Sequence, residues 1–407
     1  MSDHRSHLTL DDNQVLERLR NEGKAWIVGG WVREILLDNL ASDLDIATTL
    51  TPDKVKKLFP RTIPIGEDYG TVIVRLEKEV EKQWEVTTLR KEGTYGDGRR
   101  PDNVLFGEEI EADLARRDFT INAMAIDEKG DLIDIFGGQN DLQLNILKAV
   151  GNAKERIAED GLRIMRAFRF LDRGENNIRT MDGDLEIAII ENKEMLEKVS
   201  NERIGEEIKK ILAAHHSNKI LLKMEEMGVI ESIFKDLSID LTNTNCSNSL
   251  VTLAKILKKN DCNGTELGAK IRDILKFSKK ELALIAFLHD YKNVNFETSI
   301  ESVRRFRVYL SEKQKNAILE YHNPSEFIKK LKETKDIGDT RSPLVDGITL
   351  AKITGIKPGP KLGMLKGWLY RQQIEKNLTV KEVVLDLLDE IDYEDGDYEM
   401  WPILSWP

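Results

Sequence analysis

The sequence has few of the residues that mark secreted or membrane-embedded proteins. Only two of its 407 residues are cysteines, Cys246 and Cys262. They form neither a disulfide framework nor a metal-binding spacing, so we expect both to be reduced and structural. No apolar run is long enough to span a bilayer, and the N-terminal residues lack the charged-then-apolar order of a secretory signal. These absences predict a cytoplasmic protein without a membrane partner.

Aromatic residues are also scarce, at 6% of the chain, whereas charged residues make up 33%. This balance is typical of a soluble protein rich in helices. A chain of this length can bury a large core and should divide into two or more domains.

The net charge of −11 argues against extensive contact with nucleic acid, because phosphate contacts require lysine and arginine. The average conceals an uneven distribution. Residues 389–399 contain seven acidic side chains, whereas six arginines lie close together at positions 156, 163, 166, 169, 173 and 179. A basic surface on this acidic protein is therefore compatible with the sequence.

Strand and helix patterns divide the chain into two parts. Up to about residue 140, expected strands at 25–28, 44–47, 71–76, 84–89 and 132–135 alternate with helices at 12–21, 31–37 and 52–58. Beyond Gly151 only helices are expected, at 155–172, 185–197, 202–214, 219–227, 250–257, 279–288, 300–309, 312–321, 361–373 and 380–388. The predicted class is α+β, with a mixed head followed by an all-α remainder.

The first chemical signal is a glycine turn followed by two aspartates. Gly29 and Gly30 follow an apolar strand and precede a helix, a turn that offers backbone N–H groups to a phosphate. Asp43 and Asp45 flank Leu44 on the next expected strand, and this spacing directs both carboxylates to the same face. Two carboxylates beside a phosphate cradle form a hard-oxygen site for Mg²⁺ and suit displacement at phosphorus.

Two further segments combine arginines with apolar residues. In the stretch from Arg116 to Ala125 we expect a helix start after the two arginines, capped by Asp118 or Thr120. In the expected helix 155–172, Asp160, Arg163, Arg166 and Arg169 are spaced three apart around one side. Both patterns also suit solvated, ion-paired helix surfaces without any site.

Taken in order, these motifs resemble the nucleotidyltransferase superfamily built like DNA polymerase beta. More closely, they resemble class II tRNA nucleotidyltransferases, which add CCA, and bacterial poly(A) polymerases. The resemblance is specific over about residues 24–230 and loose beyond. It implies a head at 1–140, a helical neck at 141–230, a helical body at 231–325 and a tRNA-binding tail at 326–407 with an acidic C-terminus.

The resemblance assigns roles to individual residues. Asp43 and Asp45 would be catalytic and would hold Mg²⁺. Nucleotide binding would involve Gly29, Gly30, Arg33, Arg116, Arg117, Asp118, Asn122, Asp160, Arg163, Arg166 and Arg169. Asp160 and Arg163 would select cytosine or adenine by hydrogen bonding in place of a template. The glycine-rich segment 90–100 would be a flexible loop that adjusts nucleotide choice through Arg90, Glu92, Tyr95, Asp97 and Arg100.

The implied reaction transfers nucleotides from CTP and ATP to the 3′ end of tRNA, beside the acceptor stem. Three alternatives remain at this stage: an enzyme that adds only CC or only A, a poly(A) polymerase, and a non-catalytic RNA-binding protein. A separate His-Asp pair, His289 and Asp290, is reminiscent of metal phosphohydrolases. Because further ligands are missing nearby, we expect a histidine at a helix end there.

Overall fold

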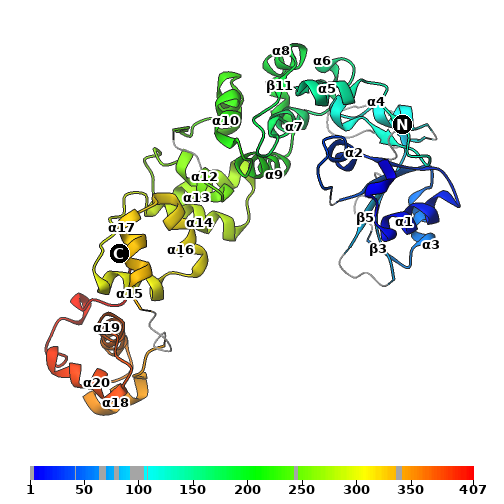
Figure 1. The fold of residues 1–407 in the computed structure, drawn as a ribbon. Coiled ribbons are helices and arrows are strands. Elements are labelled where there is room, and N and C mark those ends of the chain that lie inside the picture. The colour runs from blue at the N-terminus through cyan, green and yellow to red at the C-terminus, as the bar shows by residue number, and fades with distance from the viewer. Residues whose placement is uncertain are drawn as a thin grey trace. The chain divides into compact units, whose positions relative to one another are not determined.

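The computed structural model describes residues 4–41, 43–63, 70–77, 82–91, 105–107, 109–242, 246–335 and 342–407 (Figure 1). The chain forms two compact units. The first comprises residues 1–237 with 273–276, and the second comprises 238–272 with 277–407. Among the described helices, none has the length and apolar character needed to span a lipid bilayer. Cys246 and Cys262 form no disulfide, as expected.

A seven-stranded sheet organises the first unit, with strand order β3-β4-β5-β2-β1-β8-β9. Its strands are β1 (Ala25–Val28), β2 (Asp45–Thr48), β3 (Arg61–Ile63), β4 (Thr71–Arg75), β5 (Trp84–Thr88), β8 (Ala125–Ile126) and β9 (Leu132–Ile133). Neighbours pair antiparallel except β2 and β5, which run parallel. Helices α1 (Leu10–Arg20) and α3 (Pro52–Leu58) pack on each other and on this sheet.

Helices continue the first unit beyond the sheet (Figure 1). Helix α2 (Gly30–Ile35) lies within the sheet region. The helices that follow are α4 (Ile110–Ala115), α5 (Gly138–Leu144), α6 (Ala153–Glu159), α7 (Leu162–Leu171), α8 (Gly183–Glu191), α9 (Asn201–Leu212), α10 (Ser217–Glu226) and α11 (Val229–Phe234). Two short pairs interrupt them: β6 (Arg90–Lys91) with β7 (Leu105–Phe106), and β10 (Ile146–Leu147) with β11 (Thr180–Met181). Helix α7 packs on α9, and this contact brings together residues of the candidate functional site.

The described part of the second unit is helical. Its helices are α12 (Ser249–Ile256), α13 (Gly264–Leu275) except its end from Asp273, α14 (Lys279–Asp290), α15 (Ile300–Tyr309), α16 (Glu312–His322), α17 (Ser325–Glu333), α18 (Gly347–Thr354), α19 (Pro360–Lys376) and α20 (Lys381–Asp386). Two tryptophans of the C-terminal segment, for which the sequence suggests no role, are buried. Trp401 joins the apolar cluster around α19, and Trp406 packs against Phe296, Phe306 and Phe327.

Several local predictions are wrong. Not only helices follow Gly151, because Thr180–Met181 forms β11. The expected helix 155–172 is broken into α6 and α7, because Asp160 has an extended backbone and its carboxylate accepts the N–H of Leu162 at 3.0 Å. The two arginines do not precede an α-helix: Arg116 is the C-cap of α4, and a short 3-10 helix (Thr120–Asn122) leads into β8. Asp43 lies before the second strand, which begins at Asp45.

Asp12 fixes α1 to the sheet. Its carboxylate completes a capping box with Thr9, at 2.9 Å from the Thr9 N–H, and accepts the indole N–H of Trp84 in β5 at 2.7 Å. Lys82 lies 3.0 Å away. Burial opposes ionisation, but the bonds from Thr9 and Trp84 and the charge of Lys82 outweigh it and hold the pKa of Asp12 below its ordinary value of 3.8.

We predict that Asp12→Asn lowers the free energy of unfolding at pH 7 by about 1–3 kcal/mol, because it removes a charged, hydrogen-bonded acceptor from the interior. A carboxyl group whose pKa is lower in the folded state than in the unfolded state stabilises the fold at pH values above its unfolded-state pKa. That stabilisation is lost as pH falls through the folded value. The difference between wild type and variant should therefore shrink below about pH 4. Urea unfolding at several pH values measures it.

The matched control is Asp53→Asn, which removes a solvent-exposed carboxylate paired with Lys56 on the surface of α3. It should change stability little at any of these pH values. Equal effects of the two substitutions would contradict the anchoring role of Asp12.

Candidate functional site

A cavity of about 910 Å³ in the first unit collects most of the residues expected to bind the metal or the nucleotide. One side comes from the sheet and the N-terminus of α2, and the other comes from α7 and α9. The functional lining residues are Gly29, Gly30, Arg33, Glu34, Asp43, Asp45, Glu85, Arg117, Asn122, Arg166, Arg169, Phe170 and Lys210. The cavity thus contains acidic and basic groups contributed by segments far apart in the sequence.

Gly29 makes the turn that brings α2 against Asp45. Its φ of 74° lies in the left-handed region, and a Cβ there would lie 2.7 Å from the Oδ2 atom of Asp45. Glycine is required for both reasons. The N–H of Gly30 hydrogen-bonds to the Asp45 carboxylate. This N–H is therefore engaged by the protein, whereas the sequence pattern had suggested a free donor.

Three carboxylates meet at the sheet side of the cavity. Asp45 is paired directly with Glu85 across the parallel strands β2 and β5, and Asp43 lies two residues before Asp45 with its side chain exposed. Burial, the nearby charge of Glu85 and that of Asp43 raise the pKa of Asp45 to about 6, although Arg117 opposes this. The cluster is an excess of negative charge that a cation would relieve.

Glu85 was not predicted from the sequence. The alternation in β5 carries a signal, because Trp84, Val86 and Thr88 are buried whereas Glu85 is exposed. The signal is complete only when the register between β2 and β5 is known. Among the described residues, no group of three His, Cys, Asp or Glu side chains is arranged to hold a metal ion by itself.

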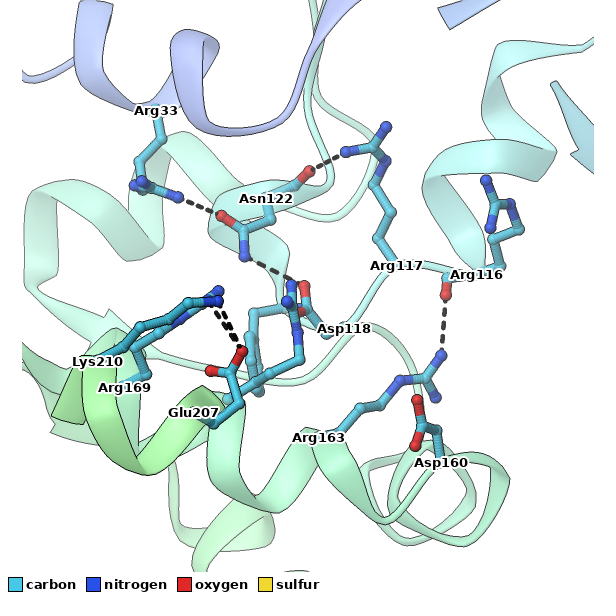
Figure 2. Close-up of polar contacts among 12 residues, drawn as sticks. Arg33, Arg116, Arg117, Asp118, Asn122, Asp160, Arg163, Arg169, Glu207 and Lys210 are labelled. Carbon is cyan, nitrogen blue, oxygen red and sulfur yellow. Dashed lines mark hydrogen bonds and ion pairs between the residues drawn. The ribbon is translucent and has the colours of Figure 1, made fainter. Parts of the chain in front are cut away.

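A hydrogen-bonded chain connects the sheet side to α7. Arg33 donates to Oδ1 of Asn122 at 2.6 Å, and Asn122 donates to Oδ1 of Asp118 at 3.1 Å (Figure 2). Oδ2 of Asp118 accepts from Nε of Arg166 at 2.7 Å. Burial of Asp118 opposes ionisation, but Arg166 and Asn122 hold its pKa below the usual range. Asp118 therefore orients residues that line the cavity without lining it itself.

The adjacent arginines, Arg116 and Arg117, share one buried partner. Both guanidinium groups bind the carboxylate of Asp113, which is 1% exposed. Burial of Asp113 is outweighed by these charges, so its pKa is lowered. Arg117 also donates to the main-chain oxygen of Asn122 at 3.2 Å. Arg117 lines the cavity, whereas Arg116 does not line it.

Asp160 and Arg163 do not line the cavity and do not share a partner. Asp160 binds Arg203 of α9, with 2.8 Å between Nη2 and Oδ2. Arg163 binds Glu159 and donates to the main-chain oxygen of Arg116 at 3.0 Å (Figure 2). The two groups expected to read one base are thus each engaged with other protein groups.

Helix α9 contributes residues that sequence reasoning missed. Glu207 is buried and binds Arg169 of α7 and Lys210 of its own helix, each at 3.2 Å (Figure 2). Three guanidinium groups, those of Arg33, Arg166 and Arg169, also lie 4.3–5.3 Å from the centre of the Phe170 ring. The helical spacing of Arg203, Glu207 and Lys210 is the only sequence signal, since their partners are remote.

The remaining predicted positions are of two kinds. Arg90 lies in β6, near Asp113, whereas Glu92, Tyr95, Asp97 and Arg100 lie outside the described residues. His289 ends α14, is 1% exposed and hydrogen-bonds to the main-chain oxygen of Cys262 at 2.9 Å. It is the helix-end histidine expected from the sequence.

Comparisons with known proteins identify the family that this chain resembles. Residues 25–148 match the model of the "Poly A polymerase head domain", and residues 180–241 match the "Probable RNA and SrmB- binding site of polymerase A". The CCA-adding enzyme of Streptococcus mutans is 34% identical over 401 residues, covering 93% of this chain and 96% of its own. The chain belongs to the family of CCA-adding enzymes.

Solved structures of this family share the fold. The CCA-adding enzyme of Bacillus stearothermophilus, solved with CTP, aligns with a TM-score of 0.75 at 25% identity, covering 96% of this chain and 98% of its own. That of Thermotoga maritima, solved with tRNA, aligns with a TM-score of 0.64 at 20% identity, covering 96% and 98%. The polymerase-beta-like head followed by helices is therefore correct. Nucleotidyltransferases of this family generally use divalent metal ions.

We predict that Gly29→Ala destabilises the protein more than Gly151→Ala. Both glycines have positive φ, 74° and 67°, so each alanine incurs backbone strain of about 1–2 kcal/mol. Only at Gly29 does the new Cβ meet a neighbour, Oδ2 of Asp45, whereas nothing lies within 4 Å at Gly151. Chemical unfolding gives the two free-energy changes.

A double-mutant cycle isolates the contact with the carboxylate. In an Asp45→Ala background the Oδ2 atom is gone, so Gly29→Ala should cost less than in the wild type, with a coupling of about 0.5–3 kcal/mol. Additive effects would show that Gly29 serves the turn alone.

Proposed function

We propose that this chain adds CCA to the 3′ ends of tRNA from CTP and ATP, releasing pyrophosphate. One observation carries the proposal: three carboxylates face a set of cationic side chains across a single cavity. Such a division of charge suits a nucleoside triphosphate with its metal ions. Membership of the CCA-adding family over nearly the whole chain supports the reaction and its cytoplasmic setting.

The carboxylates of Asp43, Asp45 and Glu85 would hold Mg²⁺. The donor set fits, because all three are hard oxygen ligands, and burial together with the charges of Glu85 and Asp43 raises the pKa of Asp45, as expected for clustered carboxylates that a cation would stabilise. Phosphate oxygens and water would complete the coordination. When bound, such ions lower the pKa of an attacking hydroxyl and neutralise a leaving group.

The cations opposite would bind the triphosphate. Arg117 lies close enough to Asp45 to lower its pKa, and Arg33 and the turn at Gly30 line the same cavity. Arg166, Arg169 and Lys210 extend the positive surface along α7 and α9. Arginine suits this role because its planar guanidinium binds two phosphate oxygens at once. Arg116, Asp118 and Asn122 would position these groups rather than bind phosphate.

Asp160 and Arg163 would select the base. Asp160 can accept a hydrogen from the exocyclic amine of cytosine or adenine, and Arg163 can donate to the neighbouring ring acceptor. Because Asp160 now binds Arg203 and Arg163 binds Glu159, base reading requires at least one of these bonds to be exchanged. The family's loop residues Arg90, Glu92, Tyr95, Asp97 and Arg100 would adjust the cavity between C and A addition.

We also propose the division into head (1–140), neck (141–230), body (231–325) and tRNA-binding tail (326–407). The match of residues 180–241 to an RNA-binding model supports an RNA contact that begins within the neck. Relatives matched over nearly their full length are CCA-adding enzymes, which favours complete CCA addition over poly(A) synthesis or partial addition.

The decisive assay incubates the protein and Mg²⁺ with a tRNA transcript lacking its 3′ CCA, and resolves the products at single-nucleotide resolution. We expect two cytidines with CTP alone, and exactly one further adenosine when ATP is added. Asp45→Asn should abolish both additions, whereas the surface control Asp53→Asn should be fully active. A ladder of adenosines with ATP alone, or a product that stops at CC with both nucleotides, would contradict complete CCA addition.

For base selection, Asp160→Ala should reduce the preference for CTP over UTP by about 10- to 100-fold, because one base contact contributes roughly 1–3 kcal/mol. The affinity for Mg²⁺ should not change. Steady-state kinetics with each nucleotide measures the ratio. The control Glu191→Ala removes an exposed partner of Lys154 in the same helical region and should leave the ratio intact. If Asp160→Ala lowers only thermal stability, its pair with Arg203 is structural.

A further inference from the structure

A second, smaller cavity adjoins the first. Its volume is about 270 Å³, and its polar lining residues include Arg33, Asn39, Asp172, Arg173, Asn176 and Arg179. Arg33, Glu34 and Phe170 line both cavities, so the two cavities share these residues as a common boundary. Arg173 and Arg179 belong to the arginine-rich stretch noted in the sequence, but no role was assigned to either, and the reaction proposed above leaves this cavity without a role.

Arg179 is the most unusual group in this cavity. Its side chain is 6% exposed, yet it forms no ion pair with any carboxylate among the described residues. Nη1 donates to the main-chain oxygens of Phe170 at 2.7 Å and Asp172 at 2.9 Å, and buried Nε has no hydrogen-bond acceptor. These bonds orient the guanidinium beside the C-terminal end of α7 but do not neutralise its charge.

Two other guanidinium groups lie near Arg179. Burial and the charges of Arg33 and Arg173 lower its pKa to about 10, although Glu34 and Asp172 oppose this. The two nearby carboxylates are committed elsewhere: Glu34 binds Arg33, and Asp172 binds the imidazole of His216 at 3.2 Å and the N–H groups of His215 and His216. Arg173 forms no hydrogen bond or ion pair with any described residue.

A buried charge is costly unless an opposite charge pairs with it. Three guanidinium groups around one small cavity therefore favour an anion, and their planar forks match phosphate oxygens. The volume is below the roughly 300–1,000 Å³ of typical small-molecule pockets. It suits a phosphate or diphosphate group rather than a complete nucleotide.

We propose that this cavity is a second phosphate-binding site, with Arg173 and Arg179 as its principal ligands. The phosphate could be supplied by free pyrophosphate or by the backbone of an RNA strand, since both present the same oxygens. The inference goes beyond the proposed reaction, and it depends only on the charge and geometry of the cavity.

The test is calorimetric titration of inorganic pyrophosphate into the full-length protein, without RNA and with CTP at saturation so that the larger cavity is filled. CTP affinity is measured first and reports separately on that cavity. We expect the wild type to bind one pyrophosphate. Arg173→Ala should weaken this binding about 10-fold or more, as expected for a charge-assisted contact, and should leave CTP affinity unchanged.

Two further variants strengthen the design. Arg179→Met should abolish pyrophosphate binding. This substitution also removes two hydrogen bonds to main-chain oxygens. If the Arg179→Met protein does not fold, Arg173→Ala remains the decisive variant. Lys154→Ala removes an exposed cation of the same region outside the cavity and should bind pyrophosphate like the wild type. Wild-type binding by Arg173→Ala would overturn the proposal, as would the absence of binding of both pyrophosphate and RNA by the wild type.

A short single-stranded RNA then distinguishes the source of the phosphate. If the RNA displaces bound pyrophosphate from the wild type and binds Arg173→Ala more weakly, the cavity holds an RNA phosphate. If pyrophosphate binds but the RNA does not displace it, the cavity holds free pyrophosphate. Either result supports a phosphate site built by Arg173 and Arg179.

Discussion

The buried carboxylate of Asp118 connects the two sides of the proposed active site. One oxygen accepts the N–H of Phe119 and the amide of Asn122, and the other binds Arg166 of α7. The carboxylate is 8% exposed, and its negative charge stays compensated because every one of these partners is a donor. Through Asn122 the same network reaches Arg33 on α2. Removing the charge would leave Arg166 without its carboxylate partner and would disturb Asn122, which orients Arg33.

This connection explains how a protein of net charge −11 can present a cationic wall. The guanidinium groups of Arg33, Arg166 and Arg169 gather around Phe170 although like charges repel. Asp118 and Glu207, both buried behind them, supply the opposing charge. The exposed faces of the cations are left for phosphate, while Asp43, Asp45 and Glu85 remain on the sheet side. Preorganisation of this kind avoids the reorganisation that water would require.

Local patterns predicted the elements well. The strand Ala25–Val28 and the helices Pro52–Leu58 and Ile300–Tyr309 have the predicted bounds, since apolar periodicity and capping residues act within one element. The family resemblance led to the correct fold, and nine of the predicted nucleotide or metal residues line one cavity: Gly29, Gly30, Arg33, Asp43, Asp45, Arg117, Asn122, Arg166 and Arg169.

What the sequence did not predict depends on pairing between distant segments. Glu85 gains its meaning from the register of β5 against β2, and Arg203 and Glu207 gain theirs from the packing of α9 on α7. A Cβ at Gly161 would lie 2.4 Å from the main-chain oxygen of Met195, so only glycine fits at this position. No local sequence pattern reveals this close tertiary contact beside the break between α6 and α7.

The affinity for CTP, measured without RNA, tests the positioning role of Asp118 most directly. It is measured in the wild type, Asp118→Asn, Arg166→Gln and the double variant. Asp118 does not line the cavity, so any effect of Asp118→Asn must act through the groups it positions. We predict that this variant, folded by near-ultraviolet circular dichroism, binds CTP more weakly. We also predict that Arg166→Gln adds little to it, because the two residues act as one unit. Wild-type affinity in Asp118→Asn, or fully additive losses in the double variant, would contradict the account.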